Sequence, residues 1–145
     1  MSIGYACINL SLADASFKTC RKENASEERL LELTEHNLNS LEQILEYNNK
    51  NDIHLFRISS DLIPFGSSEY NQIPWWEIFE GKLRRIAKFI KETDQRVSMH
   101  PGQYTVINSP KVDVVDRAIK DLEYHNRVLD SLETDYTSKI VIHAG

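Results

Sequence analysis

Two histidines stand at the ends of short apolar stretches, a position in which they could bind a metal ion. His100 ends the stretch "RVSMH" (96–100), and His143 lies near the end of "KIVIHAG" (139–145). Neutral imidazole is a good ligand for zinc, manganese and iron, so two such side chains on neighbouring strands can hold one divalent ion. Each histidine taken alone is also compatible with a structural role at a strand end.

A catalytic metal site needs more than these two ligands. Such sites usually have at least three protein ligands, and hard ions prefer carboxylates. Asp61 and Glu69 follow the second apolar run, although Asp61 could equally start a turn before Pro64. We therefore expect a divalent-metal site around His100 and His143, with Glu69 as an additional candidate ligand.

The segment after His100 carries a second kind of chemistry. Pro101 and Gly102 break regular structure, which places Gln103 and Tyr104 in a loop. The glutamine offers hydrogen-bond donors and acceptors, and the tyrosine offers a flat face with a polar tip. Such a pair can fill a gap in a nucleic-acid stack or simply cover the mouth of a barrel, and the residues alone leave both interpretations open.

The elements that must position these residues alternate between strand and helix. Apolar runs predict strands at 3–10, 53–60, 96–100 and 139–145, and helical periodicity predicts helices at 27–48, 75–92 and 112–132. Strands separated by long helices pair in parallel through right-handed crossovers. The predicted fold class is α/β, with four parallel strands and three helices in one unit over residues 1–145. An open doubly wound sheet and the first half of a (β/α)₈ (TIM) barrel both fit this order.

Further polar residues follow the predicted strands at the same ends. Asn9 lies at the carboxyl end of the first predicted strand, and Ser59, Ser60 and Asp61 follow the second. In parallel α/β folds the chemistry lies at the carboxyl ends of the strands. We therefore expect these residues to converge with the two strand-end histidines on one edge of the sheet.

The predicted helices carry apolar stripes that should face the core. The stripes are Leu31, Leu38, Leu41 and Leu45; Phe79, Leu83, Ile86 and Ile90; and Val115, Ala118, Leu122, Leu129 and Leu132. Asn24, followed by Glu27 three residues later, resembles a capping pair at the start of the first helix.

The remaining histidines and the tryptophans favour ordinary structural roles. His36 and His125 lie inside predicted helices, and His54 opens a strand at the end away from the expected site. We predict structural or surface roles for all three. Trp75 and Trp76, at the start of the second helix, favour core anchors over residues that stack on bases.

The composition excludes several classes of protein. The chain has 145 residues, two cysteines without C-x-x-C spacing and a net charge of −5. A disulfide framework or cysteine metal site is unsupported, and no signal peptide or membrane-spanning run is present, so a cytoplasmic protein with no membrane partner is expected. The negative charge argues against a general electrostatic grip on nucleic acid, but a local basic patch or bound cations can reverse it near a site.

Several stretches together resemble the UV damage endonuclease family, which comprises (β/α)₈-barrel DNA-repair enzymes. They are "GYACINLSL" (4–12), "FRISSDLIPFGS" (56–67), "SMHPGQYTVINSP" (98–110), "DLEYHNRVLD" (121–130) and "IVIHAG" (140–145). The stretches occur in family order across essentially the whole chain. The resemblance implies the amino-terminal half of the barrel, and a nick on the 5′ side of ultraviolet photoproducts in double-stranded DNA.

The resemblance also implies roles for particular residues. His100 and His143 would be ligands in a cluster of divalent ions such as manganese (Mn²⁺). Gln103 and Tyr104 would probe the lesion from the opposite strand. Tyr5 and Asn9 would lie near the flipped-out damaged nucleotides.

Two features depart from the family pattern. Many members have a histidine in the loop after the second strand, where this chain has Ser68, so one metal position is expected to be weakened, lost or rebuilt by Glu69. The family takes further ligands from later strands, so we expect residues 1–145 alone to be inactive.

Two other functions fit some of the same residues. One is a sugar isomerase or epimerase of the xylose-isomerase-like barrel type, with strand-end histidines and acids around a divalent ion. The other is a non-catalytic DNA-binding module. No residue pattern indicates an obligate protein partner, and the projecting Gln103–Tyr104 pair favours the endonuclease over a small-sugar pocket.

Overall fold

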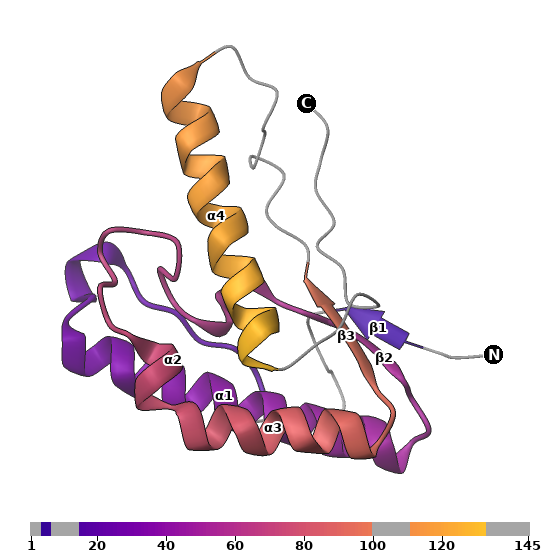
Figure 1. Ribbon diagram of the computed structural model, residues 1–145. Coiled ribbons are helices and arrows are strands. Elements are labelled where there is room, and N and C mark those ends of the chain that lie inside the picture. Colours follow the sequence, from indigo (N-terminus) through magenta and orange to yellow (C-terminus); the bar gives the residue numbers. More distant parts are fainter. Residues whose placement is uncertain (1–3, 7–14, 100–110, 133–145) are drawn as a thin grey trace.

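The computed structural model of the protein describes residues 4–6, 15–99 and 111–132. Figure 1 shows its strands and helices in order along the chain. Two short 3₁₀ helices, η1 and η2, lie among them. They are β1 (Gly4–Ala6), η1 (Lys22–Asn24), α1 (Glu27–Lys50), β2 (Leu55–Ile58), η2 (Ser60–Leu62), α2 (Trp75–Ile78), α3 (Glu80–Glu92), β3 (Arg96–Met99) and α4 (Val112–Ser131).

The three strands form one parallel sheet in the order β1-β2-β3. Leu55 at the start of β2 aligns with Gly4 on one side and with Arg96 on the other. The predicted α/β class with parallel strands is therefore confirmed for these elements. The fourth predicted strand, 139–145, lies outside the described residues.

One face of the sheet is packed against helices. Phe56 and Ile58 of β2 are buried at 2% and 0% exposure, and they join one apolar cluster with Val97 and Met99 of β3 and with the inner faces of α1 and α3. The alternate residues of β2, Leu55 and Arg57, are exposed. Since side chains alternate across a strand, the described helices bury one face of β2 and leave the other open.

Helix α1 buries a wider stripe than the leucine spacing predicts. Leu38, Leu41 and Leu45 are fully buried as expected, but Leu31 is only half-buried. Leu30 and Leu33 occupy the core in its place. The predicted cap is also wrong, because the Ser26 hydroxyl accepts a hydrogen bond from the Arg29 amide at 3.2 Å and makes Ser26 the N-cap.

The second predicted helix is divided. α2 ends at Ile78, Phe79 has φ −102° and ψ 23°, and α3 begins at Glu80. The break does not disturb the apolar stripe, since Leu83, Ile86 and Ile90 are all buried. None of the helices in the part of the chain that the structure describes combines the length and apolar character needed to cross a membrane.

Candidate functional site

The loop after β2 lies at the carboxyl edge of the sheet, where the sequence predicts a site. The Ser59 hydroxyl accepts a hydrogen bond from the Asp61 amide at 3.1 Å, so Ser59 caps the short helix η2. The side chain of Asp61 is exposed, while Leu62 and Ile63 are buried in the core. The loop therefore presents a carboxylate at this edge and anchors itself by the two apolar residues that follow.

Asn37 of α1 binds this loop and the loop that precedes α1. Its side-chain nitrogen donates to the backbone oxygens of Asp61 and Leu62, both at 3.1 Å, and to that of Lys18 at 2.9 Å. Its side-chain oxygen accepts from the Lys18 amide at 2.7 Å. Asn37 is completely buried, so these bonds replace the water that the backbone groups would otherwise need. One side chain thus fixes residue 18 beside the carboxyl end of β2.

Tyr124 of α4 holds the same loop from the other side. Its hydroxyl donates to the Ser60 backbone oxygen at 2.7 Å and accepts from the Ile63 amide at 3.1 Å. Burial raises the pKa of the Tyr124 phenol well above its ordinary value. The hydroxyl therefore keeps its proton, and with it the bond to Ser60, across the physiological pH range.

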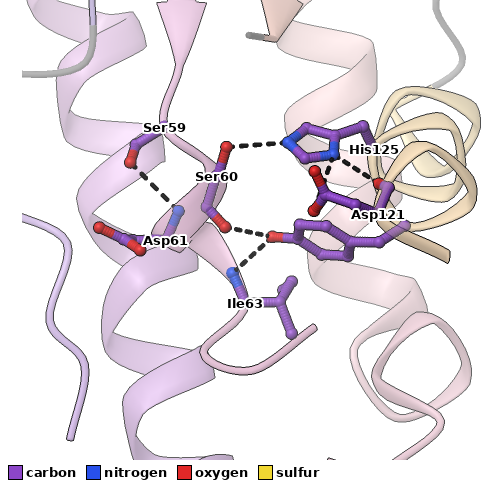
Figure 2. Close-up of polar contacts among 7 residues, drawn as sticks. Ser59, Ser60, Asp61, Ile63, Asp121 and His125 are labelled. Carbon is purple, nitrogen blue, oxygen red and sulfur yellow. Dashed lines mark hydrogen bonds and ion pairs between the residues drawn. The ribbon is translucent and has the colours of Figure 1, made fainter. Parts of the chain in front are cut away.

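His125, the next residue of α4, makes a second bond to Ser60. Figure 2 shows the Ser60 hydroxyl pointing at the His125 ring, and the oxygen lies 2.8 Å from Nε2. The other ring nitrogen, Nδ1, lies 2.6 Å from the Asp121 backbone oxygen. Because that oxygen can only accept, Nδ1 carries the proton, and in the neutral ring Nε2 accepts from the Ser60 hydroxyl.

Ser60, His125 and Asp121 have the composition of a nucleophilic triad, but their geometry is structural. The Asp121 carboxylate lies 3.6 Å from Nδ1, whereas the proton on that nitrogen points to the backbone oxygen 2.6 Å away. The His125 side chain is completely buried, so it cannot reach a bound substrate. The arrangement fixes the loop after β2 rather than activating Ser60.

A hollow of about 290 Å³ separates the rest of this loop from α4. Ser68 and Glu69 line it on the loop side, and Lys120 and Arg127 line it on the α4 side. The Arg127 guanidinium lies 4.0 Å from the centre of the Trp76 ring, a cation–π contact at the edge of the hollow. Both carboxylates and cations therefore line this space.

The backbone reverses sharply just before this hollow. Phe65 has a left-handed φ of 55°, which is uncommon for a bulky residue, and Gly66 follows it. A Cβ on Gly66 would lie 2.2 Å from Cε1 of Tyr124. Only glycine allows the loop to pass this close to the ring.

The structure describes few of the residues predicted to do chemistry. Tyr5 lies in β1, where its backbone aligns with Phe56, while Asn9, His100, Gln103, Tyr104 and His143 lie outside the described residues. Ser68 is half-buried and Glu69 is exposed. Over residues 15–99 and 111–132, no group of three or more histidine, cysteine, aspartate or glutamate side chains could hold a metal ion.

The sequence reasoning missed Asn37 and Tyr124 and assigned His125 no more than a structural or surface role. His125 is indeed structural, and it is buried. A signal was present for Asn37, which lies at helical spacing between Leu33 and Leu41 on the buried face of α1. A polar residue in a buried stripe must have a hydrogen-bond partner, and this one binds two loops.

The parallel sheet, the helices that cover it and the fixed loops at its carboxyl edge define a parallel α/β protein. One solved structure has the same fold over nearly the whole chain. The crystal structure of SacUVDE superimposes with a TM-score of 0.94 and 43% identity, over 99% of this chain and 49% of that one. The sequence model of the UV-endonuclease UvdE family matches residues 1–145. The chain therefore belongs to the UvdE family of UV endonucleases.

Three similar proteins are also named as endonucleases that act on UV damage. The chain is 50% identical over its full length to a UV DNA damage endonuclease of Clostridium perfringens, of which it covers 35%. It is 35% identical to the UV-damage endonuclease of Schizosaccharomyces pombe, covering 26% of it, and 33% identical to a UV DNA damage endonuclease of Bacillus cereus, covering 48%. The chain thus spans between about a quarter and a half of these relatives.

Proposed function

We propose that the protein to which these residues belong is a DNA-repair endonuclease that nicks the damaged strand 5′ to UV photoproducts. The observation that carries the proposal is the family match over all 145 residues, together with the TM-score of 0.94 to SacUVDE. The fixed loops at the carboxyl edge support it, because catalysis at this edge needs side chains held in place before substrate binds.

Residues 1–145 are proposed to be the amino-terminal half of a TIM-barrel domain. The strand order β1-β2-β3 follows the chain order, and the described helices pack on one face of the sheet. A doubly wound sheet reverses its strand order at a switch point and carries helices on both faces. The observed winding supports the barrel, in which the exposed alternate residues of β2 would face the barrel interior.

His100 and His143 are proposed to bind a divalent ion, with manganese as the expected metal and Glu69 as an additional ligand. Two imidazoles and a carboxylate are a donor set that suits such an ion. When bound, the metal would neutralise charge on the phosphate and activate water for hydrolysis. By the family resemblance Ser68 stands in place of a histidine, and Glu69, which lines the same hollow, is the carboxylate proposed to compensate.

Four further residues are proposed to contact the damaged DNA. Tyr5 and Asn9 would lie beside the extruded nucleotides, and Gln103 and Tyr104 would contact the opposite strand. Extruding nucleotides requires a few kcal/mol, and less where the lesion already weakens stacking. This difference would let the enzyme select damaged sites in double-stranded DNA.

The test is a nicking assay on the protein expressed over its complete reading frame. A duplex with one cyclobutane pyrimidine dimer, labelled at the 5′ end of the damaged strand, should be cut 5′ to the dimer in the presence of manganese. An otherwise identical undamaged duplex should remain intact. Folded protein that leaves the damaged duplex uncut refutes the proposed function.

A variant tests the proposed metal ligand by a measurement that does not depend on nicking activity. His143→Ala should lower both the manganese content, measured by inductively coupled plasma mass spectrometry, and the nicking rate. His54→Ala is the matched control, since His54 pairs with Asp52 at the amino-terminal end of β2. Unchanged manganese content in His143→Ala removes that residue from the ligand set.

A further inference from the structure

The loop before α1 concentrates positive charge on a chain that is acidic as a whole. Residues 15–26 contain three cations, Lys18, Arg21 and Lys22, and one carboxylate, Glu23, whereas the net charge of the chain is −5. All three cations are exposed. We refer to Lys18, Arg21 and Lys22 as the basic loop.

The basic loop lies at the carboxyl edge of the sheet. The side-chain oxygen of Asn37 accepts from the Lys18 amide, and its side-chain nitrogen donates to the Lys18 backbone oxygen. The same nitrogen also donates to the backbone oxygens of Asp61 and Leu62. Those two residues follow β2 directly in the chain. The cations are therefore on the edge where the proposed nicking reaction takes place.

The path of the basic loop is fixed before any ligand binds. The Ser16 backbone oxygen accepts from the Ser40 hydroxyl at 3.2 Å and lies 2.9 Å from Nε2 of His36, both on α1. At its other end, the Lys22 ammonium lies 4.5 Å from the centre of the Tyr70 ring, on the loop after β2. Because the backbone is already ordered, binding requires little further loss of backbone conformational entropy.

The cations are available for an external anion. Arg21 and Arg29 line one shallow surface hollow, together with one carboxylate, Glu23. Arg29 forms an ion pair with Glu32 at 3.2 Å. Hydrogen bonding to Tyr70 raises the pKa of Lys22, so its ammonium is charged at neutral pH.

We infer that the basic loop binds the phosphodiester backbone of DNA beside the site of cleavage. This inference rests on the proposed function and deepens it, since it names the surface that meets the phosphates. Cations that contact phosphates add affinity without reading bases or lesions. Because residues 1–145 carry a net charge of −5, DNA binding at this edge needs such a local surface.

The test measures how DNA affinity depends on salt, using the protein expressed over its complete reading frame. The variant Lys18→Gln/Arg21→Gln removes two charges and keeps the backbone bonds of residue 18 to Asn37. The matched control, Lys88→Gln/Lys91→Gln, removes two charges from the carboxyl-terminal end of α3, which leads to the opposite edge of the sheet. Fluorescence anisotropy on duplexes with and without one cyclobutane dimer gives the dissociation constants at several salt concentrations.

The expected result is a smaller slope of log affinity against log salt. Each lost phosphate contact should reduce the slope by about 0.9, so the basic-loop variant should lose about 1.8 and each single variant about half of that. The loss should be the same for damaged and undamaged duplexes, leaving the preference for the lesion unchanged. The control should keep the slope of the unmodified protein.

Three results overturn the inference while leaving the proposed function in place. They are an unchanged slope in the basic-loop variant, an equal loss in the control, and a changed preference for the lesion. Failure of the unmodified protein to bind or nick the damaged duplex is a different outcome, since it refutes the proposed function itself. Circular dichroism and a thermal melt establish that each variant is folded.

Discussion

Gly66→Ala should destabilise the protein through one steric contact. A Cβ at this position would lie 2.2 Å from Cε1, 2.5 Å from Cδ1 and 2.8 Å from Cζ of Tyr124. Carbon atoms prefer separations of about 3.5–4.0 Å, so the ring would have to retreat by more than about 1 Å. Tyr124 is only 6% exposed, and its hydroxyl is bonded to Ser60 and Ile63, so retreat breaks or stretches both bonds.

The expected loss of stability is about 2–4 kcal/mol. Overpacking of a core typically destabilises by about 1–3 kcal/mol, and each lost hydrogen bond by about 1 kcal/mol. Alanine also restricts the unfolded chain, which offsets about 0.4–1 kcal/mol of this loss. No described glycine has a positive φ, so the effect at Gly66 is steric and not conformational.

Urea unfolding followed by tryptophan fluorescence measures the loss, because Trp75 packs edge-on against Tyr124, with ring centres 6.5 Å apart. Gly81→Ala is the matched control. Nothing lies within 4 Å of a Cβ at Gly81, in α3, so this change should be neutral or stabilise by up to about 1 kcal/mol.

A double-mutant cycle tests whether the Tyr124 ring is the cause. In a Tyr124→Leu background the ring is absent, so Gly66→Ala should destabilise by about 1–3 kcal/mol less than in the unmodified protein. Additive effects of the two substitutions on the free energy of unfolding would refute the proposed contact between the loop and α4. A loss of stability below about 1 kcal/mol for Gly66→Ala alone would refute it too.

Two further substitutions test the bonds that hold the loop after β2. Tyr124→Phe should lower the free energy of unfolding by about 2 kcal/mol in urea titrations, since it leaves the Ser60 oxygen and the Ile63 amide without this partner. Burial raises the Tyr124 pKa, so the unfolded chain loses its phenolic proton first as the pH rises above about 10. The stability that Tyr124 contributes should therefore decline above that pH. The difference in free energy of unfolding between the unmodified protein and Tyr124→Phe should then narrow, and a constant difference up to pH 11 contradicts this account. Asn37→Ala removes a side chain that makes four backbone hydrogen bonds and should destabilise by about 2–4 kcal/mol, and Asn37→Asp should do no better because it turns an oxygen toward backbone oxygens. Asn39→Ala, on the exposed side of α1, removes one solvent-exposed bond from Lys82 and should change stability by less than about 0.5 kcal/mol in the same titration. Equal effects at positions 37 and 39 would argue against the buried role.

The helices and strands that could be predicted are those whose burial repeats along the chain. The apolar stripe of α1 repeats at helical spacing, and the predicted helix 27–48 differs from Glu27–Lys50 by two residues. The break at Phe79 could not be predicted, because α2 and α3 continue one apolar stripe across it. Periodicity reports which face of a segment is buried, and it is insensitive to a bend that keeps the face.

The position of the loop after β2 at the carboxyl edge could be predicted, but the contacts that hold this loop could not. Parallel strands bring their carboxyl ends together, which places Ser59, Ser60 and Asp61 at the edge from chain order alone. The contact of Tyr124 with Ser60 joins residues 64 apart in the sequence. The predicted stripe of this helix named Leu122, which is only half-buried, whereas Tyr124 is buried. Helical spacing also does not show which loop lies against the helix.

The loop after β2 is held by contacts on both sides of Ser68. Asn37 and Tyr124 bind its backbone at residues 60–63, and Asn71 binds it again, donating to the Pro64 oxygen at 2.8 Å and accepting from the Ile73 amide at 3.0 Å. Ser68 lies between these anchors, and its hydroxyl accepts a hydrogen bond from the Tyr70 amide at 3.2 Å in an exposed turn. Because the path of the loop is fixed by contacts on either side, the residue at position 68 can change without moving it. Under the proposed metal site, replacing Ser68 with histidine would therefore alter the ligands offered to a metal, while the loop that would present them would keep its place.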